Sequence, residues 1–466
     1  MSTRYSEYHV HGDNIIECER AVALFQAALA DRTTSWVGPT GSPVCPQYEF
    51  TLDGEREPVR LTLLPGFGRW NQDILEAIRA RGGGLREAAD VIVTGLSKGA
   101  EEPLLAIEFC GALPAGNQAW QRSGRAFSFA KAAVPYLYVA ELGGYELGSG
   151  RERKAARLPN PAVPFGYLSF SLTAGTPTLP VFVASPGADA DSRRIYAAVF
   201  ADAELLDIVR ATMLAEPIED AVERVRLKAL SFVEVKAKGS RAGGTLTPDQ
   251  WEKAYAAIVS GRGLLDYLAM ETGIRWSKVT SIPLTSTATE LMQAAADSGI
   301  GLTAKDLPMC VVPRRERKRF ADHVVKIYGS RLSSTFLDWL RRDEHLAICW
   351  VMGFKPRHDD ARPDRGLAPL TRMLVGPQAD LLTVIYGPAA PPSWVQLDRD
   401  PQRLMRDNGL WEAVLSISDA IIGDALTDTV RKHGYTRSHW TSAIALPASA
   451  FAPVEPTPRR IGENDV

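Results

Sequence analysis

The stretch Asp90 to Val93 (DVIV), followed by Leu104 to Cys110 (LLAIEFC), decides the fold and the chemistry that we expect of this chain. Both runs are short and apolar, which predicts two neighbouring buried strands. Asp90 stands at the head of the first run, and Glu108 lies near the end of the second. Hard carboxylate oxygens, one or two of them together with substrate phosphate, hold Mg²⁺. The pair therefore predicts a site for metal-assisted phosphodiester hydrolysis.

A polar and cationic run follows the second strand and suits a phosphate-rich substrate. On a helix over residues 118–133, Gln118 and Arg122 are four positions apart on one face, and Gln121 and Arg125 are paired in the same way. We expect the two glutamines to be polar supports of the site, Arg122 to clamp the phosphate and Arg125 to contact nucleic acid. Ordinary polar positions on a helix are the alternative for the glutamines.

The elements expected around these strands alternate between helix and strand. Apolar spacing and turn signals predict helices at residues 15–28, 70–80, 118–133, 202–213, 219–230 and 247–260. They predict further strands at residues 47–52, 58–64, 136–140, 167–172, 179–184 and 347–352. Gly12 or Asp13 is the expected cap of the first helix. This order describes a mixed α/β layer, with a sheet flanked by helices.

The length of the chain, 466 residues, predicts two or three domains, because a single core stops growing at roughly 250–300 residues. We place a first domain at residues 1–150 and a mixed α/β region at 165–330. An α+β region at 331–447 and a tail at 448–466 follow. The tail is rich in proline and charge, which is typical of disorder.

Charge and cysteine content narrow the class of protein. The net charge of −2, from 53 basic and 55 acidic residues, argues against a histone-like coating of nucleic acid, but local basic surface is enough for a DNA enzyme. The five cysteines are scattered, without the close spacing of a zinc site or a small disulfide framework. We expect a cytoplasmic protein with no membrane association, since no run approaches the ~20 apolar residues of a membrane helix and the N-terminus lacks a secretory signal.

At this point the residues resemble a known group. Glu17 on an early helix, Asp90 and Glu108-Phe109-Cys110 resemble the motif of the PD-(D/E)XK nuclease superfamily, which includes type II restriction endonucleases and Holliday-junction resolvases. The string GDNIIECER at residues 12–20 resembles the resolvase-type opening, in which a glutamate reaches toward the metal. The resemblance covers about the first 140 residues. It implies a restriction-endonuclease-like mixed sheet and hydrolysis that leaves a 5′-phosphate. It also implies Mg²⁺ (or Mn²⁺) held by Glu17, Asp90 and Glu108.

The chain departs from the family motif at two positions. Ala89 stands where a proline often precedes the first acid. Cys110 stands where the family has the lysine that orients the attacking water and stabilises charge on the phosphorane. A thiol is a poor substitute because it is a weak donor. The nearby groups that could replace the lysine are Gln118, Gln121, Arg122 and Lys98.

A rival Glu-x-Lys lies further along, at Glu234-Val235-Lys236. Its upstream acid would be Asp220 or Asp207, and the run 231–237 would be its strand. The alternative is a solvated face, since alternating charges beside valines are common on exposed strands.

Simpler interpretations stay open for several acids and histidines. Asp90 can cap a turn, and Glu17 can be surface charge on a helix. His9 and His11 alternate, so in a strand they share a face. A role in metal binding and a role in capping or at the surface are both open for them.

Two basic stretches are candidates for contact with nucleic acid. Cations on one strip gain affinity by counterion release, which points to Arg314, Arg315, Arg317 and Lys318. The alternative is the solvated start of a helix. The second stretch, residues 362–366 (RPDRG), is either a loop that contacts DNA or a ligand, or a turn stabilised by arginine.

Together these features predict a Mg²⁺-dependent DNA endonuclease, of the bacterial restriction or phage-defence kind. Its partner would be double-stranded DNA, recognised by the region after residue 165. A homodimer is expected for a palindromic target, and a cognate methyltransferase would belong to the same system. A decayed nuclease fold that binds DNA or regulates is the alternative. An unrelated small-molecule enzyme is disfavoured because the Walker, dinucleotide, Gly-x-Ser-x-Gly and His-Glu-x-x-His motifs are absent from the sequence.

Overall fold

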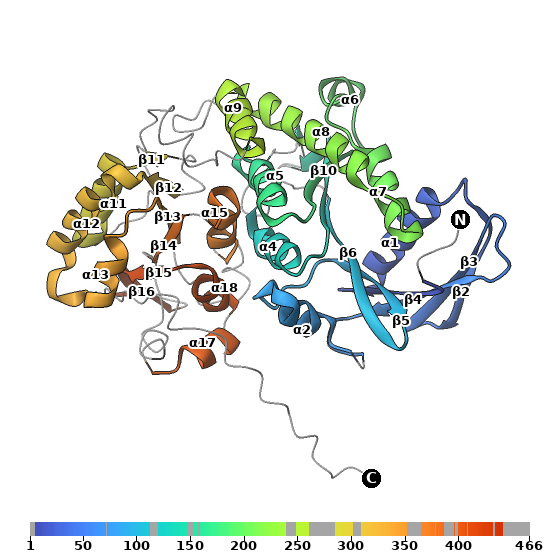
Figure 1. The fold of residues 1–466 in the computed structure, drawn as a ribbon, viewed down its shortest axis with the longest axis horizontal. Helices are drawn as coiled ribbons and strands as arrows, with labels where there is room; N and C mark the ends of the chain where they lie inside the picture. Colours follow the sequence, from blue (N-terminus) through green and yellow to red (C-terminus); the bar gives the residue numbers. More distant parts are fainter. Residues whose placement is uncertain are drawn as a thin grey trace, which may run out of the picture.

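Two β-sheets, each covered by helices, organise the chain in a computed structural model (Figure 1). The structure describes residues 5–70, 72–111, 120–147, 152–155, 159–238, 248–260, 285–301, 309–351, 365–377, 379–385, 396, 399–407, 409–431 and 434–440. The tail expected at 448–466 lies outside these residues. None of the helices in the described ranges is long and apolar enough to cross a membrane.

The first sheet has eight strands in the order β10-β7-β6-β5-β1-β4-β3-β2. Their bounds are β1 Glu7–Gly12, β2 Thr33–Ser42, β3 Cys45–Leu52, β4 Val59–Pro65, β5 Val91–Ser97, β6 Ala100–Cys110, β7 Tyr136–Leu142 and β10 Thr178–Ala184. Strand β1 pairs parallel with β4 and antiparallel with β5, and β6 pairs antiparallel with β5 and parallel with β7. The sheet is therefore mixed, and the predicted α/β class is confirmed.

Helices cover both faces of this sheet, because successive side chains of its buried strands point to opposite sides. Val91 and Ile107 face a core shared with α1 (Ile15–Ala28) and α7 (Asp202–Leu214). Ile92 and Ala106 face a core shared with α4 (Ser123–Lys131) and α5 (Ala162–Ala174). The long helix α8 (Glu219–Lys238) contributes to both cores.

Helix α1 has the expected bounds, but its capping residue differs from both expected ones. Asn14, and not Gly12 or Asp13, accepts hydrogen bonds from the amides of Ile16 and Glu17 with its side chain. A Cβ on Gly12 would overlap the Cys18 sulfur, so glycine at the end of β1 lets α1 approach the sheet. This close approach carries the first turn of α1 towards the end of β5.

Two expected strands are helices. Residues 167–172 lie within α5, and the rival Glu234-Val235-Lys236 lies within α8. The first prediction failed because α5 is buried nearly all round, so its apolar run lacks the spacing that separates a helix from a strand. The second failed because residues 219–238 form one continuous helix, so the run 231–237 is not an active strand. Helix α9 (Pro248–Val259) agrees with its prediction.

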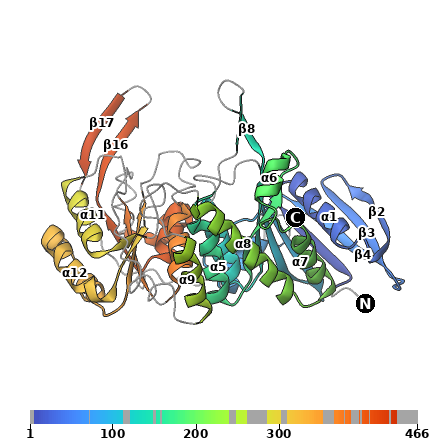
Figure 2. The ribbon, with the colours of Figure 1, turned by 90° about the horizontal axis from the view of Figure 1, so that it is seen from above.

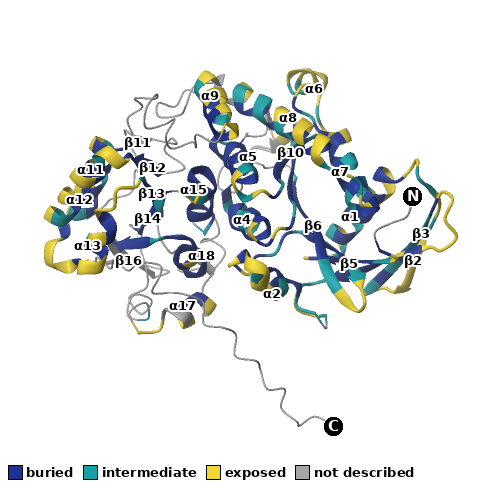
Figure 3. Cartoon of the chain, viewed as in Figure 1, coloured by how far each residue is buried: buried dark blue, intermediate teal, exposed yellow. Residues whose placement is uncertain are grey.

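The second sheet has five strands in the order β11-β12-β13-β14-β15. Their bounds are β11 Ile300–Gly301, β12 Met309–Val312, β13 Leu346–Val351, β14 Asp380–Ile385 and β15 Ala420–Gly423. Helices α11 (Ser286–Ser298), α12 (Arg314–Tyr328) and α13 (Ser334–Leu340) lie on its outer side, as Figure 1 shows. Helices α15 (Leu367–Val375) and α18 (Gly409–Ile417) lie between the two sheets, and Figure 3 shows them mostly buried there.

The first sheet with its helices and the second sheet with its helices form two layers, and these two layers share one apolar core. Helix α15 packs on α5, where a Cβ added to Gly166 would lie 2.8 Å from Leu370 Cδ1 and 3.3 Å from Leu374 Cγ. Trp120 and Trp411 belong to the same buried cluster, which runs from α4 to α18. The contact between the two layers is therefore close-packed and apolar.

These contacts correct the predicted domain boundaries. The first sheet does not end at residue 150, because β10 extends it by pairing with β7. The region 165–330 is not one unit either, since its helices up to residue 259 pack with the first sheet and residues from 286 onward join the second. The break lies between α9 and α11.

The remaining elements are short or peripheral. They are α2 Ile74–Ile78, a π-helical turn Arg79–Gly83, β8 Tyr145–Leu147, β9 Arg153–Ala155, α6 Ala190–Ile195, a 3-10 turn Gly329–Arg331, α17 Pro401–Asp407, β16 Ala425–Arg431 and β17 Gly434–Trp440. Figure 2 shows the β16–β17 hairpin extending away from the body of the molecule.

Candidate functional site

Asp90 and Glu108 lie side by side where β5 and β6 pair. The antiparallel register places Val91 opposite Ile107, so Asp90 and Glu108 are the next two positions on their strands. The Asp90 amide donates to Glu108 Oε2 at 3.3 Å, and the Phe109 amide donates to Asp90 Oδ2 at 2.8 Å. The structure thus brings together the two acids that the sequence singles out, on the face of the sheet that α4 covers.

Two arginines neutralise Glu108. Arg122 Nε donates to Glu108 Oε1 at 2.6 Å, and Arg125 Nη1 donates to both carboxylate oxygens. Arg125 Nη1 also lies 3.5 Å from Asp90 Oδ1. The Glu108 side chain is 0% exposed, and a buried carboxylate requires such partners. In this structure Arg122 and Arg125 therefore pair with Glu108. The roles expected from the sequence were a phosphate clamp for Arg122 and a nucleic-acid contact for Arg125.

Glu17 joins the two acids from the first turn of α1. The amide of Asp13, just before that helix, donates to the Asp90 carbonyl at 3.0 Å and ties the helix start to the end of β5. Glu17 Oε2 is buried and has no hydrogen-bond partner among the described residues. The sequence indicated Glu17 from its place in the motif, and the structure puts it within electrostatic reach of Asp90 and Glu108.

The proton affinities of these acids are shifted together. Burial, followed by repulsion from Asp90, Asp13 and Glu108, raises the pKa of Glu17 to about 7. Burial and the neighbouring Glu108 raise the pKa of Asp90 to about 6, against the opposing effect of Arg125. Clustered carboxylates with raised pKa values are typical of a site that a further cation would stabilise.

The donor set fits Mg²⁺ in chemistry but not in arrangement, because among the described residues the ligand atoms of Glu17, Asp90 and Glu108 do not all lie within 4.8 Å of one another. Glu17, Asp90 and Glu108 offer the hard oxygens that Mg²⁺ prefers, and the unpartnered Glu17 Oε2 is free to take part. Both oxygens of Glu108, however, are bonded to Arg125. For Glu108 to hold an ion, Arg125 must give up at least one of these bonds.

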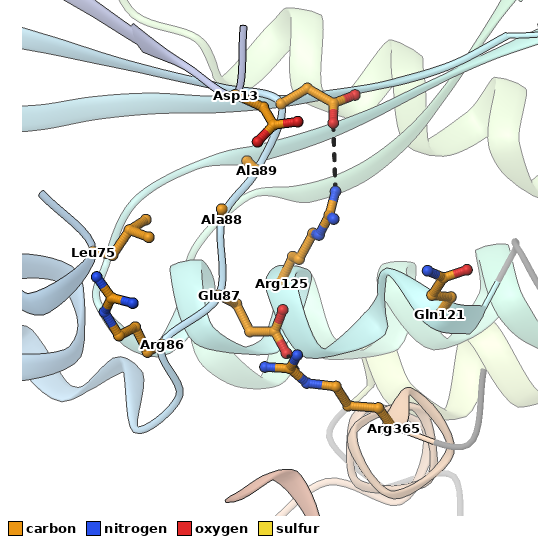
Figure 4. Close-up of a pocket in the computed structure, with 10 residues that line it drawn as sticks. Asp13, Leu75, Arg86, Glu87, Ala88, Ala89, Gln121, Arg125 and Arg365 are labelled. Atoms are coloured by element: carbon orange, nitrogen blue, oxygen red, sulfur yellow. Dashed lines mark hydrogen bonds and ion pairs between the residues drawn. The ribbon is translucent and has the colours of Figure 1, made fainter. Parts of the chain in front are cut away.

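A cavity of ≈ 350 Å³ opens beside Asp90. Asp13, Asp90, Gln121 and Arg125 line it from the first layer, and Arg365 lines it from the C-terminal part of the chain (Figure 4). In Figure 4, Arg125 rises from α4 towards the acids, while Arg365 lies beside Glu87. The cavity is therefore lined by both signs of charge, with the acids Asp13, Glu87 and Asp90 and the cations Arg86, Arg125 and Arg365.

Arg365 is anchored by carboxylates of both layers. Its Nε lies 2.7 Å from Glu87 Oε1, and its Nη2 lies 3.8 Å from Glu412 Oε2. Of the two interpretations of residues 362–366, the ion pairs agree with the arginine-stabilised turn, and the cavity wall agrees with ligand contact. Residues 362–364 lie outside the described ranges. Sequence reasoning missed Glu87 and Glu412, which have no motif and are found only by their contacts.

The residues proposed to replace the missing lysine fall in different places. Lys98 sits in the turn at the far end of β5 and so is not a candidate for this site. Gln121 lines the cavity, and Gln118 lies outside the described residues. Cys110 is buried, and burial raises the pKa of its thiol, so it stays neutral. Among the described residues, Arg122 and Arg125 are therefore the cations nearest to the acids.

The floor of the site is aromatic and buried. Strand β7 places Tyr138 opposite Glu108, and Tyr136 and Tyr167 complete a buried cluster behind it. Burial raises the pKa of all three phenols, with the charge of Glu108 a further cause for Tyr136 and Tyr167. Sequence reasoning placed these tyrosines only in the expected strands at residues 136–140 and 167–172 and gave them no role. Their low-polarity surroundings strengthen the charge interactions of Glu108.

The basic strip of α12 divides into a buried residue and exposed ones. Arg317 is 0% exposed, donates to the carbonyls of Leu340 and Trp339 at 3.0 and 2.7 Å, and pairs with Asp380 at 2.6 Å. Its predicted contact with nucleic acid is therefore wrong, because it joins α12 to α13 and β14. The exposed members are Arg314, Arg315 and Lys318. Helix α12, which carries them, lies on the outer side of the second sheet, away from β5 and β6 (Figure 1).

The acids of this site thus come from α1, β5 and β6, and the cations come from α4 and the residue just before it. This assembly rests on the residues of this chain alone. Comparison of the chain with protein-family models, with curated proteins and with solved structures gave no match.

Proposed function

We propose that this chain is a Mg²⁺-dependent endonuclease that hydrolyses phosphodiester bonds of double-stranded DNA, in a bacterial restriction or phage-defence system. The observation that carries the proposal is the pairing of Asp90 with Glu108, with Glu17 within electrostatic reach of both, a cavity lined by Asp90, and raised pKa values for Glu17 and Asp90. The antiparallel β5–β6 pair, followed by α4 and the parallel strand β7, supports a restriction-endonuclease-like arrangement of the acids.

Glu17, Asp90 and Glu108 would hold the ion through their carboxylate oxygens. Bound Mg²⁺ supplies Lewis-acid polarisation of the phosphoryl oxygen and a positive charge that activates water. Arg125 would leave one oxygen of Glu108 and turn to the phosphate in the cavity, where its side chain already forms part of the wall. Arg122 would stay on Glu108 and keep that carboxylate in place. This exchange of partners by Arg125 gives the site a role for an arginine where the family has lysine.

The proton that leaves the attacking water needs an acceptor. A carboxyl with a pKa of about 7, as in Glu17, gains or loses a proton near neutral pH. Glu17 Oε2 has no donor among the described residues, so it is available to accept one. Glu17 would thus either ligate the ion or receive the proton, and its substitution by glutamine removes the negative charge and the ability to accept the proton.

The part of the chain from residue 286 onward would supply recognition of the DNA sequence. It contributes Arg365 to the cavity and three exposed cations on α12. A palindromic target would require a homodimer, because two-fold symmetry in the protein matches two-fold symmetry in DNA. A cognate methyltransferase would protect the host sequence.

A plasmid-cleavage assay tests the proposal. Supercoiled DNA, methylated and unmethylated, is incubated with wild type, Asp90→Asn and Glu108→Gln, with Mg²⁺, with Mn²⁺ and with EDTA. Glu290→Gln, an exposed acid on α11, is the matched control. We expect cleavage only with a divalent ion, a loss of at least ~100-fold in both site variants, and wild-type activity in the control. Equal cleavage by wild type and both site variants would overturn the proposal.

One observation favours a second candidate, a DNA-binding protein on a nuclease-like fold that does not cut. Glu108 is already neutralised by two arginines, and Cys110 replaces the lysine. In that case wild type shifts DNA in a gel without cleaving it, and Asp90→Asn binds as tightly as wild type. Cleavage by wild type that Asp90→Asn abolishes excludes this candidate.

A further inference from the structure

A second cluster of ligand groups lies on the same sheet but outside the acid site. His9 and His11 project from one face of β1, and Glu101 comes from the beginning of β6, beyond β5. His9 Nδ1 lies 2.9 Å from Glu101 Oε1, and His11 Nε2 lies 2.6 Å from Glu101 Oε2. One ligand atom of each of the three residues lies within 4.8 Å of the others, and no other group in the described part of the chain meets this criterion.

Two neighbouring polar residues, Thr94 and Glu7, lie next to the ligand groups Glu101 and His9. Thr94 Oγ1 donates to Glu101 Oε2 at 2.7 Å and fixes the carboxylate. Glu7 Oε1 lies 3.7 Å from His9 Nε2, the ring nitrogen that faces away from Glu101. A carboxylate near the distal nitrogen of a histidine sets its tautomer and orientation when the other nitrogen binds a metal. Thr94 thus holds Glu101, while Glu7 lies within ion-pair range of His9 but beyond hydrogen-bond distance.

Burial leaves the cluster one opening. The side chains of His11 and Glu101 are 1% and 8% exposed, whereas that of His9 is 17% exposed. An ion would therefore enter beside His9, and solvent or a ligand would complete its coordination from that side. Sites with three protein ligands and an open position are the kind found in catalytic zinc sites.

The cluster and the acid site are built from different residues of the same sheet, and they approach each other at His11, which pairs with Ile92, two positions from Asp90. Glu101 and Glu108 lie seven positions apart on β6, which is roughly 20 Å along an extended strand. Their donor types also differ, because imidazole nitrogen suits zinc and related ions, while an all-oxygen set suits Mg²⁺.

We propose that His9, His11 and Glu101 bind a divalent transition-metal ion of the zinc class. Binding replaces the two histidine–carboxylate contacts by bonds to the ion. His9 then carries its proton on Nε2, facing Glu7, and His11 carries its proton on Nδ1. The ion would tie β1 to β6 across β5 and leave an open coordination position. The proposal does not depend on nuclease activity, so either one stands if the other fails.

Zinc binding to the full-length protein tests this site. Protein stripped with a chelator is titrated with Zn²⁺ by calorimetry, and its metal content is measured after dialysis. We expect His9→Ala and Glu101→Gln to bind one equivalent less than wild type. His323→Ala, which removes an exposed histidine on α12, should bind as wild type. The double variant Asp90→Asn/Glu108→Gln should keep the equivalent that His9→Ala loses.

The visible spectrum of bound Co²⁺ reports which residues ligate the ion. Substitution of a residue with only a structural role would leave this spectrum unchanged. Co²⁺ bound by two imidazoles and a carboxylate absorbs in the visible range, and we expect this band in wild type and His323→Ala but not in His9→Ala. Circular dichroism checks that each variant folds. If Glu101→Gln does not fold, the His9→Ala variant alone tests the proposal, because His9 is partly exposed and its loss should be tolerated. Zinc stoichiometry and cobalt spectrum equal to wild type in a folded His9→Ala variant would overturn the proposal.

Discussion

The backbone amide of Asp90 lies 3.3 Å from Glu108 Oε2, and the Asp90 carboxylate accepts the amide of the residue after Glu108 at 2.8 Å. Each acid is thus held by the strand that carries the other. The antiparallel ladder between β5 and β6 fixes their separation, since no loop intervenes at this point. Such rigidity is what a preorganised site needs, because catalytic groups on strands are placed more firmly than groups on loops.

We predict that Arg125→Ala destabilises the fold by about 2 to 4 kcal/mol, because it leaves buried Glu108 with Arg122 as its one remaining charged partner. Urea unfolding measures the change. Adding Glu108→Gln to Arg125→Ala should restore part of the stability, since the buried charge is then gone. Arg194→Ala, whose ion pair is 79% exposed on both sides, should change stability by less than ~0.5 kcal/mol. An Arg125→Ala variant as stable as Arg194→Ala would contradict this account of Glu108.

The raised pKa of Glu17 predicts a pH-dependent stability. A carboxyl whose pKa is higher in the folded state, about 7 against an ordinary 4.5, binds its proton more tightly when folded. Its contribution is therefore fully present below pH 4.5 and is lost as pH rises towards 7. We expect the free energy of unfolding of wild type, compared with Glu17→Gln, to fall across this window. Urea unfolding at a series of pH values measures the difference, and parallel curves for the two proteins would refute the prediction.

We expect Arg317→Ala to lower the free energy of unfolding by about 3 to 5 kcal/mol. The substitution removes the charged partner of Asp380 and the donor to two carbonyls at the end of α13. The exposed neighbours provide the control. The triple variant Arg314→Ala/Arg315→Ala/Lys318→Ala should unfold within about 1 kcal/mol of wild type. In a gel-shift assay at low salt, the triple variant reports whether this strip contributes to DNA binding. A stable Arg317→Ala variant would mean that its buried contacts are dispensable.

Gly166→Ala should destabilise the contact between the two layers by about 1 to 3 kcal/mol, because the new methyl group would press on Leu370. Shortening Leu370 should make room for the new methyl group. The double variant Gly166→Ala/Leu370→Ala should therefore lose less free energy of unfolding than the sum of the losses in the two single variants. A double-mutant cycle of thermal or urea unfolding gives this coupling. Strict additivity of the two changes would show that α5 and α15 do not meet as described.

Local patterns in the sequence indicated much of the first sheet. The apolar run after Asp90 and the apolar run that contains Glu108 are expected as paired strands because each is short and bounded by turn signals. The strands at Cys45–Leu52 and Val59–Pro65 followed from the Asp53-Gly54 turn between them. These predictions succeeded because strand pairing between neighbours in sequence depends on residues that are close along the chain.

Other features could not be inferred in this way. The run 167–172 has no clear helical or alternating period, and only its enclosure between the first sheet and α15 makes a helix the better solution. The charge of Arg317 suggested a surface, yet the carbonyls of α13 and the carboxylate of Asp380 bury it. A charged side chain is buried only when distant segments provide its partners.

The sequence by itself determined the α/β class, the pairing of β5 with β6 and the presence of two acids at their ends, because these depend on the alternation and turn chemistry of neighbouring residues. Only the tertiary structure decided which charges meet. It placed Arg122 and Arg125 on Glu108, Arg365 on Glu87, and His9 and His11 on Glu101. The physical reason is that electrostatic partners are chosen by distance and burial in space, and neither quantity is encoded in the spacing of residues along the chain.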